Sequence, residues 1–152
     1  MRCKLLLAAF AALLWGAAAF GQASYIVEQI GRDEHQIVQS LGAFVGIDGA
    51  ESRAFDITFM PAGNGVEGVM VVTTADFRAT FKMAQRSSEC FEILVEVRSA
   101  DFLRDFNRLF QTYPTQGSDA LRTMDFGNQK LRIAETSLPN ARHRSFRITE
   151  AE

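Results

Sequence analysis

The chain has 152 residues, a formal net charge of −2 and 47% hydrophobic residues, a composition that excludes disorder for most of its length. A length near 150 residues favours one domain, whose core can hold the fold without disulfides or metals. The near-neutral charge argues against nucleic-acid binding, which needs a basic face to replace phosphate counterions.

The N-terminal segment has the order of a secretory signal peptide. Two basic residues precede an uninterrupted apolar run over positions 5–20, and small residues follow at Gly21 and Ala23. The run would span about 24 Å as a helix, against roughly 30 Å for a bilayer core. We therefore predict a cleaved leader over residues 1–23. Cleavage after Ala23 is preferred to cleavage after Gly21, and an uncleaved membrane anchor is the alternative.

Removal of this leader would change the chain in two ways. The remaining residues 24–152 would carry a net charge of −4, because Arg2 and Lys4 are lost. They would also keep only one of the two cysteines, Cys90. We predict a single periplasmic or secreted domain without a stable membrane span, and we expect a monomer. We interpret Cys90 as a small buried hydrophobe at the start of a strand. An intermolecular disulfide or a reactive thiol is the alternative.

The segment from Ser24 to Val45 predicts an amphipathic helix, because its apolar residues fall within about 120° of arc when wound at 100° per residue. Ser24 is a suitable N-cap and Gly42 a suitable end, whereas Gly31 in the middle disfavours a continuous helix. A hairpin that turns at residues 31–34 is the alternative.

A β-hairpin is predicted next, from the alternating residues 55–59 and the valine-rich run 66–73. Gly63, Gly65 and Gly68 between and within them spell GxGxxG. In a dinucleotide site the third glycine opens a helix that receives the pyrophosphate. Here a β-branched run follows Gly68, so we expect no nucleotide and no other cofactor.

The second half of the chain alternates clear strand patterns with one helix. Residues 77–84 alternate as a strand would, although Thr74 could also cap a helix over them. Residues 91–97 form a clearer strand, with Cys90 on its glutamate side. Ser99 is a good N-cap for a helix near 100–112, whose four apolar side chains form one stripe. Three further strands are expected at 121–126, 131–136 and 144–149. The sequence thus predicts an α+β fold, mainly an antiparallel sheet, with the N-terminal amphipathic helix and the helix near 100–112 packed on it.

Catalytic motifs are missing from the sequence. His35 and His143 belong to no motif, and no HExxH, CxxC or GxSxG pattern occurs, so we expect no metal site and lean against an enzyme. Whether Asp56, Glu96 and Asp125 converge in a cleft is left open by their spacing.

One basic cluster stands near the C-terminus. As a strand, its residues would place Arg142 and Arg144 on one face and Arg147 on the other. A solvated edge strand is the simplest interpretation. The functional interpretation is that Arg142, Arg144 and Arg147 contact an anionic partner, either a protein or an envelope polymer.

These observations favour a small exported accessory protein that binds rather than catalyses. A carrier of a small apolar ligand in a phenylalanine-lined cavity is one alternative. A small enzyme using buried Asp or Glu acid–base chemistry is another.

Overall fold

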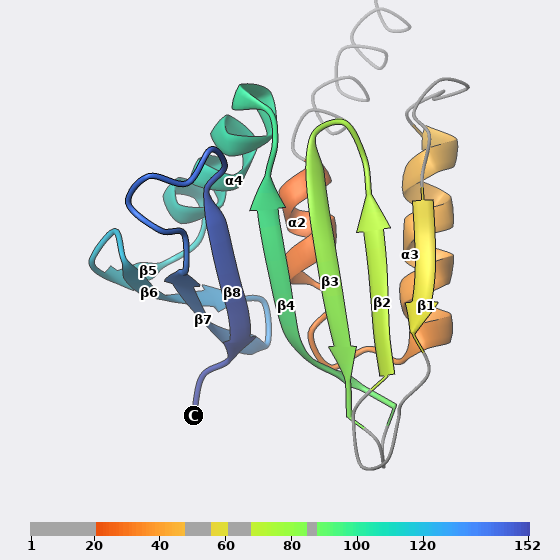
Figure 1. The fold of residues 1–152 in the computed structure, drawn as a ribbon. Helices are drawn as coiled ribbons and strands as arrows, with labels where there is room; N and C mark the ends of the chain where they lie inside the picture. Colours follow the sequence, from red (N-terminus) through yellow and green to blue (C-terminus); the bar gives the residue numbers. More distant parts are fainter. Residues whose placement is uncertain (1–20, 48–55, 61–67, 85–87) are drawn as a thin grey trace, which may run out of the picture.

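The computed structural model describes residues 21–47, 56–60, 68–84 and 88–152 (Figure 1). Elements keep the labels of Figure 1, which begin at α2. The helices are α2 (Gly21–Val27), α3 (Glu34–Ile47) and α4 (Ala100–Thr112). The strands are β1 (Asp56–Met60), β2 (Gly68–Thr73), β3 (Phe77–Met83), β4 (Cys90–Val97), β5 (Thr115–Gly117), β6 (Leu121–Phe126), β7 (Gln129–Glu135) and β8 (Ser145–Glu150). The predicted leader lies outside the described residues except for 21–23, and so do Gly63 and Gly65.

Within the described residues, eight strands form one antiparallel sheet in the order β1-β2-β3-β4-β8-β7-β6-β5. One meander runs from β1 to β4 and a second from β5 to β8, and α4 connects them. The two meanders meet where β4 pairs with β8, with Val95 opposite Phe146. The predicted mixed fold with an antiparallel sheet is confirmed.

All three described helices lie on one side of the sheet, behind it in Figure 1. The core fills the space between these helices and the sheet. Its largest side chains that are almost wholly buried include Ile26, Ile30, Ile37, Phe81, Phe102, Phe106, Ile93, Met124, Leu131 and Ile148. We call the opposite side of the sheet, which these helices do not cover, the open face.

The alternation in β3 decides which side chains enter this core. Phe77, Ala79, Phe81 and Met83 are buried, while the residues between them lie on the open face. The strand predicted over 77–84 is therefore confirmed. The hairpin predicted from 55–73 is confirmed by the pairing of β1 with β2.

The helix predicted near 100–112 is also confirmed as α4. The Ser99 hydroxyl accepts a hydrogen bond from the Phe102 backbone N–H at 3.1 Å, which caps the first turn. The helix packs on the sheet through its aromatic stripe. Phe102 lies 4.9 Å from Phe77, and Phe106 lies 4.7 Å from Phe146, between ring centres.

The continuous helix predicted from Ser24 to Val45 is wrong. The chain forms two helices, with α2 beginning at Gly21 rather than at Ser24 and α3 continuing past Gly42 to Ile47. Gly31 lies between the helices with φ +81°, a conformation that a glycine adopts without strain. The chain does turn at this glycine, but it joins two helices and not the two strands of a hairpin.

The predicted side of Cys90 is also wrong. Phe91 is an extra residue in β4, because Lys82 lies opposite Glu92 while Met83 lies opposite Cys90. This bulge turns Cys90 toward the helices and leaves Phe91 38% exposed. The buried Cys90 side chain matches the interpretation of a core residue.

Candidate binding surface

The open face carries a group of polar side chains that no described helix covers. Strand pairing arranges them in rows across the sheet. In one row Arg78 lies opposite Glu96, which lies opposite Ser145. In the next row Leu94 lies opposite Arg147. The open face therefore mixes cations, carboxylates, hydroxyls and a few apolar side chains.

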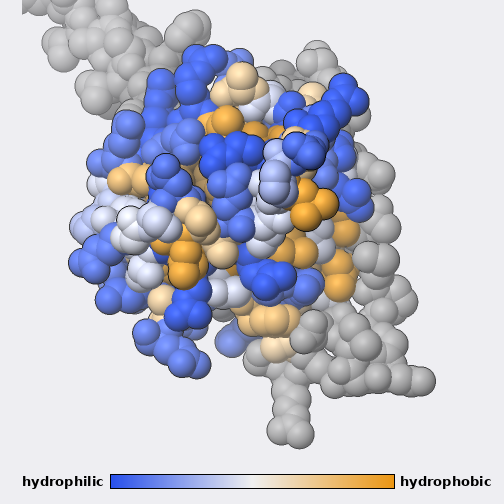
Figure 2. All heavy atoms as spheres, turned by 60° about the vertical axis from the view of Figure 1, so that its left-hand side comes forward, coloured by the Kyte–Doolittle hydropathy of each residue, from blue (hydrophilic) through white to orange (hydrophobic). Residues whose placement is uncertain are grey.

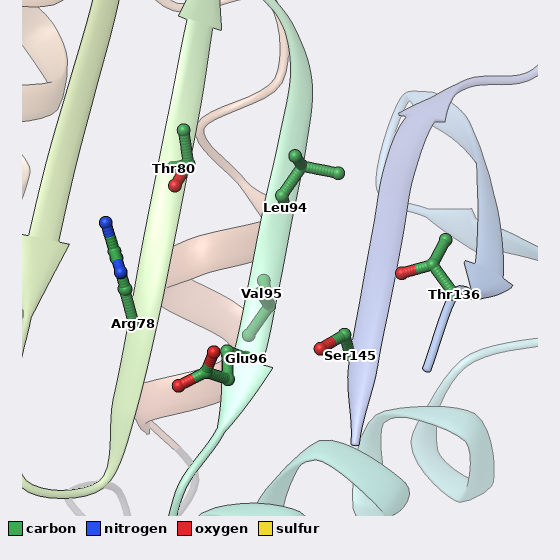
Figure 3. A pocket seen from close by; sticks show the side chains of 7 residues that line it. All are labelled: Arg78, Thr80, Leu94, Val95, Glu96, Thr136 and Ser145. Carbon is green, nitrogen blue, oxygen red and sulfur yellow. The ribbon is translucent and has the colours of Figure 1, made fainter. Parts of the chain in front are cut away.

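A shallow hollow of about 330 Å³ lies on these rows. Figure 3 shows Leu94 reaching from β4 toward β8, and Glu96 lying between β4 and β3. Thr136 closes the hollow just beyond β7, where its backbone N–H donates to the Ser145 carbonyl oxygen at 2.8 Å. The lining residues are Arg78, Thr80, Leu94, Val95, Glu96, Thr136 and Ser145.

Glu92 anchors the neighbouring row. Its side chain is only 13% exposed, and its two carboxylate oxygens lie 2.5 Å from Lys82 Nζ and 3.4 Å from Arg147 Nε. A carboxylate this sheltered needs such partners, because its interaction with water is largely lost. The triad fixes Lys82 and Arg147 across three adjacent strands, β3, β4 and β8.

Among the described residues of the open face, cations outnumber carboxylates. The six cations are Arg78, Lys82, Arg98, Lys130, Arg132 and Arg147, and the four carboxylates are Glu92, Glu96, Asp125 and Asp76, which lies opposite Arg98 just beyond the strand ends. Within this described part of the chain Arg78 and Arg132 are exposed and form no ion pair. The open face is thus basic, although the whole chain has a net charge of −2.

The three arginines of the predicted cluster do not form one patch. Arg147 lies on the open face, whereas Arg144 lies on the helix side, with its guanidinium 5.1 Å from the ring centre of Phe146. Arg142 is exposed in the loop between β7 and β8. The predicted split between Arg144 and Arg147 is confirmed, but β8 begins at Ser145, so Arg142 and Arg144 precede the strand.

The sequence analysis missed Arg78, Lys82 and Arg132 as members of this surface. The alternation within β3 put Arg78 and Lys82 on one face, which was the available signal. The residues of β8 join this surface because β4 pairs with β8, and local sequence patterns do not reveal that pairing. Arg132 joins them through Thr149 of β8.

Glu96 and Asp125, two of the three carboxylates considered for catalysis, do not meet. Glu96 on β4 and Asp125 on β6 are separated by β8 and β7, a gap of roughly 14 Å at the usual strand spacing. Glu96 Oε1 is paired with Arg98 Nε at 2.8 Å. The side chain of Asp56 lies outside the description.

Burial raises the pKa of the Cys90 thiol to about 12, and the nearby Glu92 carboxylate adds to this rise. Two backbone hydrogen bonds oppose it without reversing it. A thiol with so high a pKa carries almost no thiolate at neutral pH, so it is a poor nucleophile. His35, which belongs to no catalytic motif, is exposed on α3.

No protein-family model, curated protein or solved structure matches this chain. Among the described residues, no three metal-binding side chains lie close enough together to hold a metal ion. The described helices are also too short or too polar to cross a membrane.

Proposed function

We propose that this chain is a small exported binding protein that holds an acidic protein partner against the open face of its sheet. The observation that carries the proposal is the excess of cations on a sheet face that the described helices leave uncovered. The proposed action is binding without catalysis, in the periplasm or outside the cell, as the leader pattern indicates.

The charges favour an acidic partner in two ways. Arg78 and Arg132 are free to pair with a partner's carboxylates, because no described carboxylate occupies them. Lys82 and Arg147 share the single Glu92 carboxylate, so the triad keeps a net positive charge that a partner's carboxylate can neutralise. Complementary charge would steer the partner to this face and orient it there.

The apolar side chains favour a protein over an anionic polysaccharide. Leu94 lies between Thr80 and Arg147 on the open face, and Leu121 at the far side of this face is 50% exposed. A protein surface offers apolar side chains to cover them, whereas a charged polysaccharide does not. Hydrophilic and hydrophobic residues are interspersed over the side of the molecule formed by β5 to β8 (Figure 2).

The test measures binding of poly-L-glutamate to the full chain at low salt. Replacing both Arg78 and Arg132 with alanine is expected to weaken binding about tenfold, because each exposed ion pair contributes about 0.2–1 kcal/mol. The matched control replaces Arg104 and Arg108, which are exposed on α4 in the other layer. Equal losses in both double variants would contradict the open-face proposal. Stronger binding to a sulfated polysaccharide than to poly-L-glutamate would contradict an acidic protein as the partner.

A further inference from the structure

A second hollow lies on the helix side of the sheet, between the end of α4 and strands β5 and β6. Its volume is about 550 Å³, a size that suits a monosaccharide or a dipeptide. We call it the arginine groove, because Arg122 of β6 and Arg144 line it together with Asn107 and Gln111 of α4. It is distinct from the open face, which lies on the other side of the sheet.

Arg122 occupies a position where the strand pattern calls for an apolar residue. It lies opposite the buried Ile133, on the same side of β6 as the fully buried Met124. Its side chain is only 21% exposed. A charged residue that faces the core side of a strand breaks the binary pattern, and natural proteins break it mainly at functional sites.

The guanidinium of Arg122 lies over the ring of Phe110. Its central carbon lies 4.1 Å from the ring centre of Phe110, so the ring covers one face of the group. Arg122 also donates through Nη2 to the Asp119 carboxylate. The Asp119 side chain is 92% exposed, and an ion pair so open to water holds weakly.

Arg144 is fixed differently. Its Nε and Nη2 atoms donate to the two carboxylate oxygens of Glu135 at 2.9 and 2.7 Å. Ser137 Oγ donates to the same carboxylate at 2.7 Å. This bidentate pair holds the arginine at the rim of the groove, and Nη1 makes no hydrogen bond to another described residue.

We propose that the arginine groove binds the carboxylate of a small ligand. The ligand's carboxylate takes the place of Asp119 on Arg122 and gains a second donor from Arg144. The side-chain amides of Asn107 and Gln111 then offer hydrogen bonds to the rest of the ligand. Asp119 acts as an internal stand-in that keeps Arg122 paired while the groove is empty.

Two ligand sources share this chemistry, a sugar acid and the C-terminus of a peptide. The probes are therefore glucuronate and N-acetyl-alanyl-alanine, each compared with its uncharged amide, with binding to the full chain followed by calorimetry. We expect at least one acid to bind and its amide to bind at least about tenfold more weakly. Which acid binds identifies the source. Failure of both acids to bind, or equal binding of acid and amide, would overturn the proposal.

Asp119→Asn provides the sharper test, because Asp119 is so exposed that the fold should tolerate the change. Removing the internal competitor is expected to tighten acid binding several-fold. The control is Asp101→Asn, since Asp101 pairs with Arg104 at the same three-residue spacing but on the outer surface of α4. An unchanged affinity in Asp119→Asn, or an equal gain in Asp101→Asn, would refute the stand-in role.

Discussion

The backbone N–H of Gly31 donates a hydrogen bond to the carbonyl oxygen of Cys90 across 2.8 Å. The backbone N–H of Cys90 returns one to the carbonyl oxygen of Arg32, also at 2.8 Å. The turn between α2 and α3 is therefore attached to the start of β4. This attachment acts together with the positive φ of Gly31 to divide the amphipathic segment into two helices.

Gly31→Ala is expected to destabilise the protein by about 1–2 kcal/mol or more, because a positive φ strains any residue with a Cβ atom. The new Cβ would also lie 3.1 Å from Gln129 Nε2, which donates to the Ile30 carbonyl oxygen. Urea denaturation measures the loss. Gly127→Ala is the control, since its φ is +62° but no atom lies within 4 Å of its added Cβ. A smaller loss for Gly31→Ala than for Gly127→Ala would contradict the role given to the Gln129 contact.

Cys90 is expected to resist thiol reagents in the folded protein. Its side chain is buried and its pKa is raised to about 12, so little thiolate forms and the reagent cannot reach it. In a Cys3→Ser chain at pH 8, a colorimetric thiol assay should show reaction only as fast as the protein unfolds. The same chain should react at once in denaturant and run as a monomer on a non-reducing gel. Rapid reaction without denaturant, or a dimer band that reductant removes, would show that Cys90 is accessible.

Glu135 is expected to make stability depend on acid pH. Its hydrogen bonds from Arg144 and Ser137 lower its pKa from 4.5 to about 2. The pair therefore contributes fully above pH 4.5, and the contribution is lost as the pH falls through about 2. Because both side chains are partly exposed, the loss should be no more than about 1 kcal/mol.

Comparing Glu135→Gln with the parent chain by urea denaturation at pH 6 and at pH 2.5 isolates this effect. The stability difference between the two proteins should shrink at the lower pH. Glu150→Gln, at the end of β8, serves as the control. A difference that stays constant between the two pH values would mean that the Glu135 pair does not titrate as described.

We expect cleavage of the proposed leader after Gly21, in place of the position after Ala23 that the sequence pattern favours, so that Gln22 becomes the N-terminus. Ala23 is fully buried in the core, and its backbone N–H donates to Asp105 Oδ2 of α4 at 2.9 Å. Cleavage after Ala23 would remove this buried residue, whereas cleavage after Gly21 keeps it. Intact-mass measurement of the protein from its own cells decides between the two positions. A mature chain that begins at Ser24 would contradict the expectation.

Local sequence patterns were sufficient to predict much of the fold. The alternation from Phe77 to Met83 and the capped stripe from Ser99 to Leu109 each depend on nearby residues, so the sequence predicted both elements. The bulge at Phe91 escaped prediction, because a single extra residue is defined only by the partner strand. Strand β5 also escaped, since Thr115–Gly117 show no alternation.

The candidate surface was harder to predict for the same reason. Arg147 was singled out as part of a sequence cluster, but its neighbours on the sheet are Leu94 and Ala134. Glu92 shows nothing unusual in the sequence, yet it pairs with both Lys82 and Arg147. Long-range strand order creates this surface, and no run of adjacent residues encodes it.

The most direct test of the central claim is to map the binding surface in solution. Backbone amide NMR shifts of the full chain, recorded while poly-L-glutamate is added, locate the contact residue by residue. We expect the largest shifts at Arg78, Arg132, Arg147 and their neighbours on β3, β4, β7 and β8. Shifts concentrated on α3 or α4, with those strands unchanged, would contradict it.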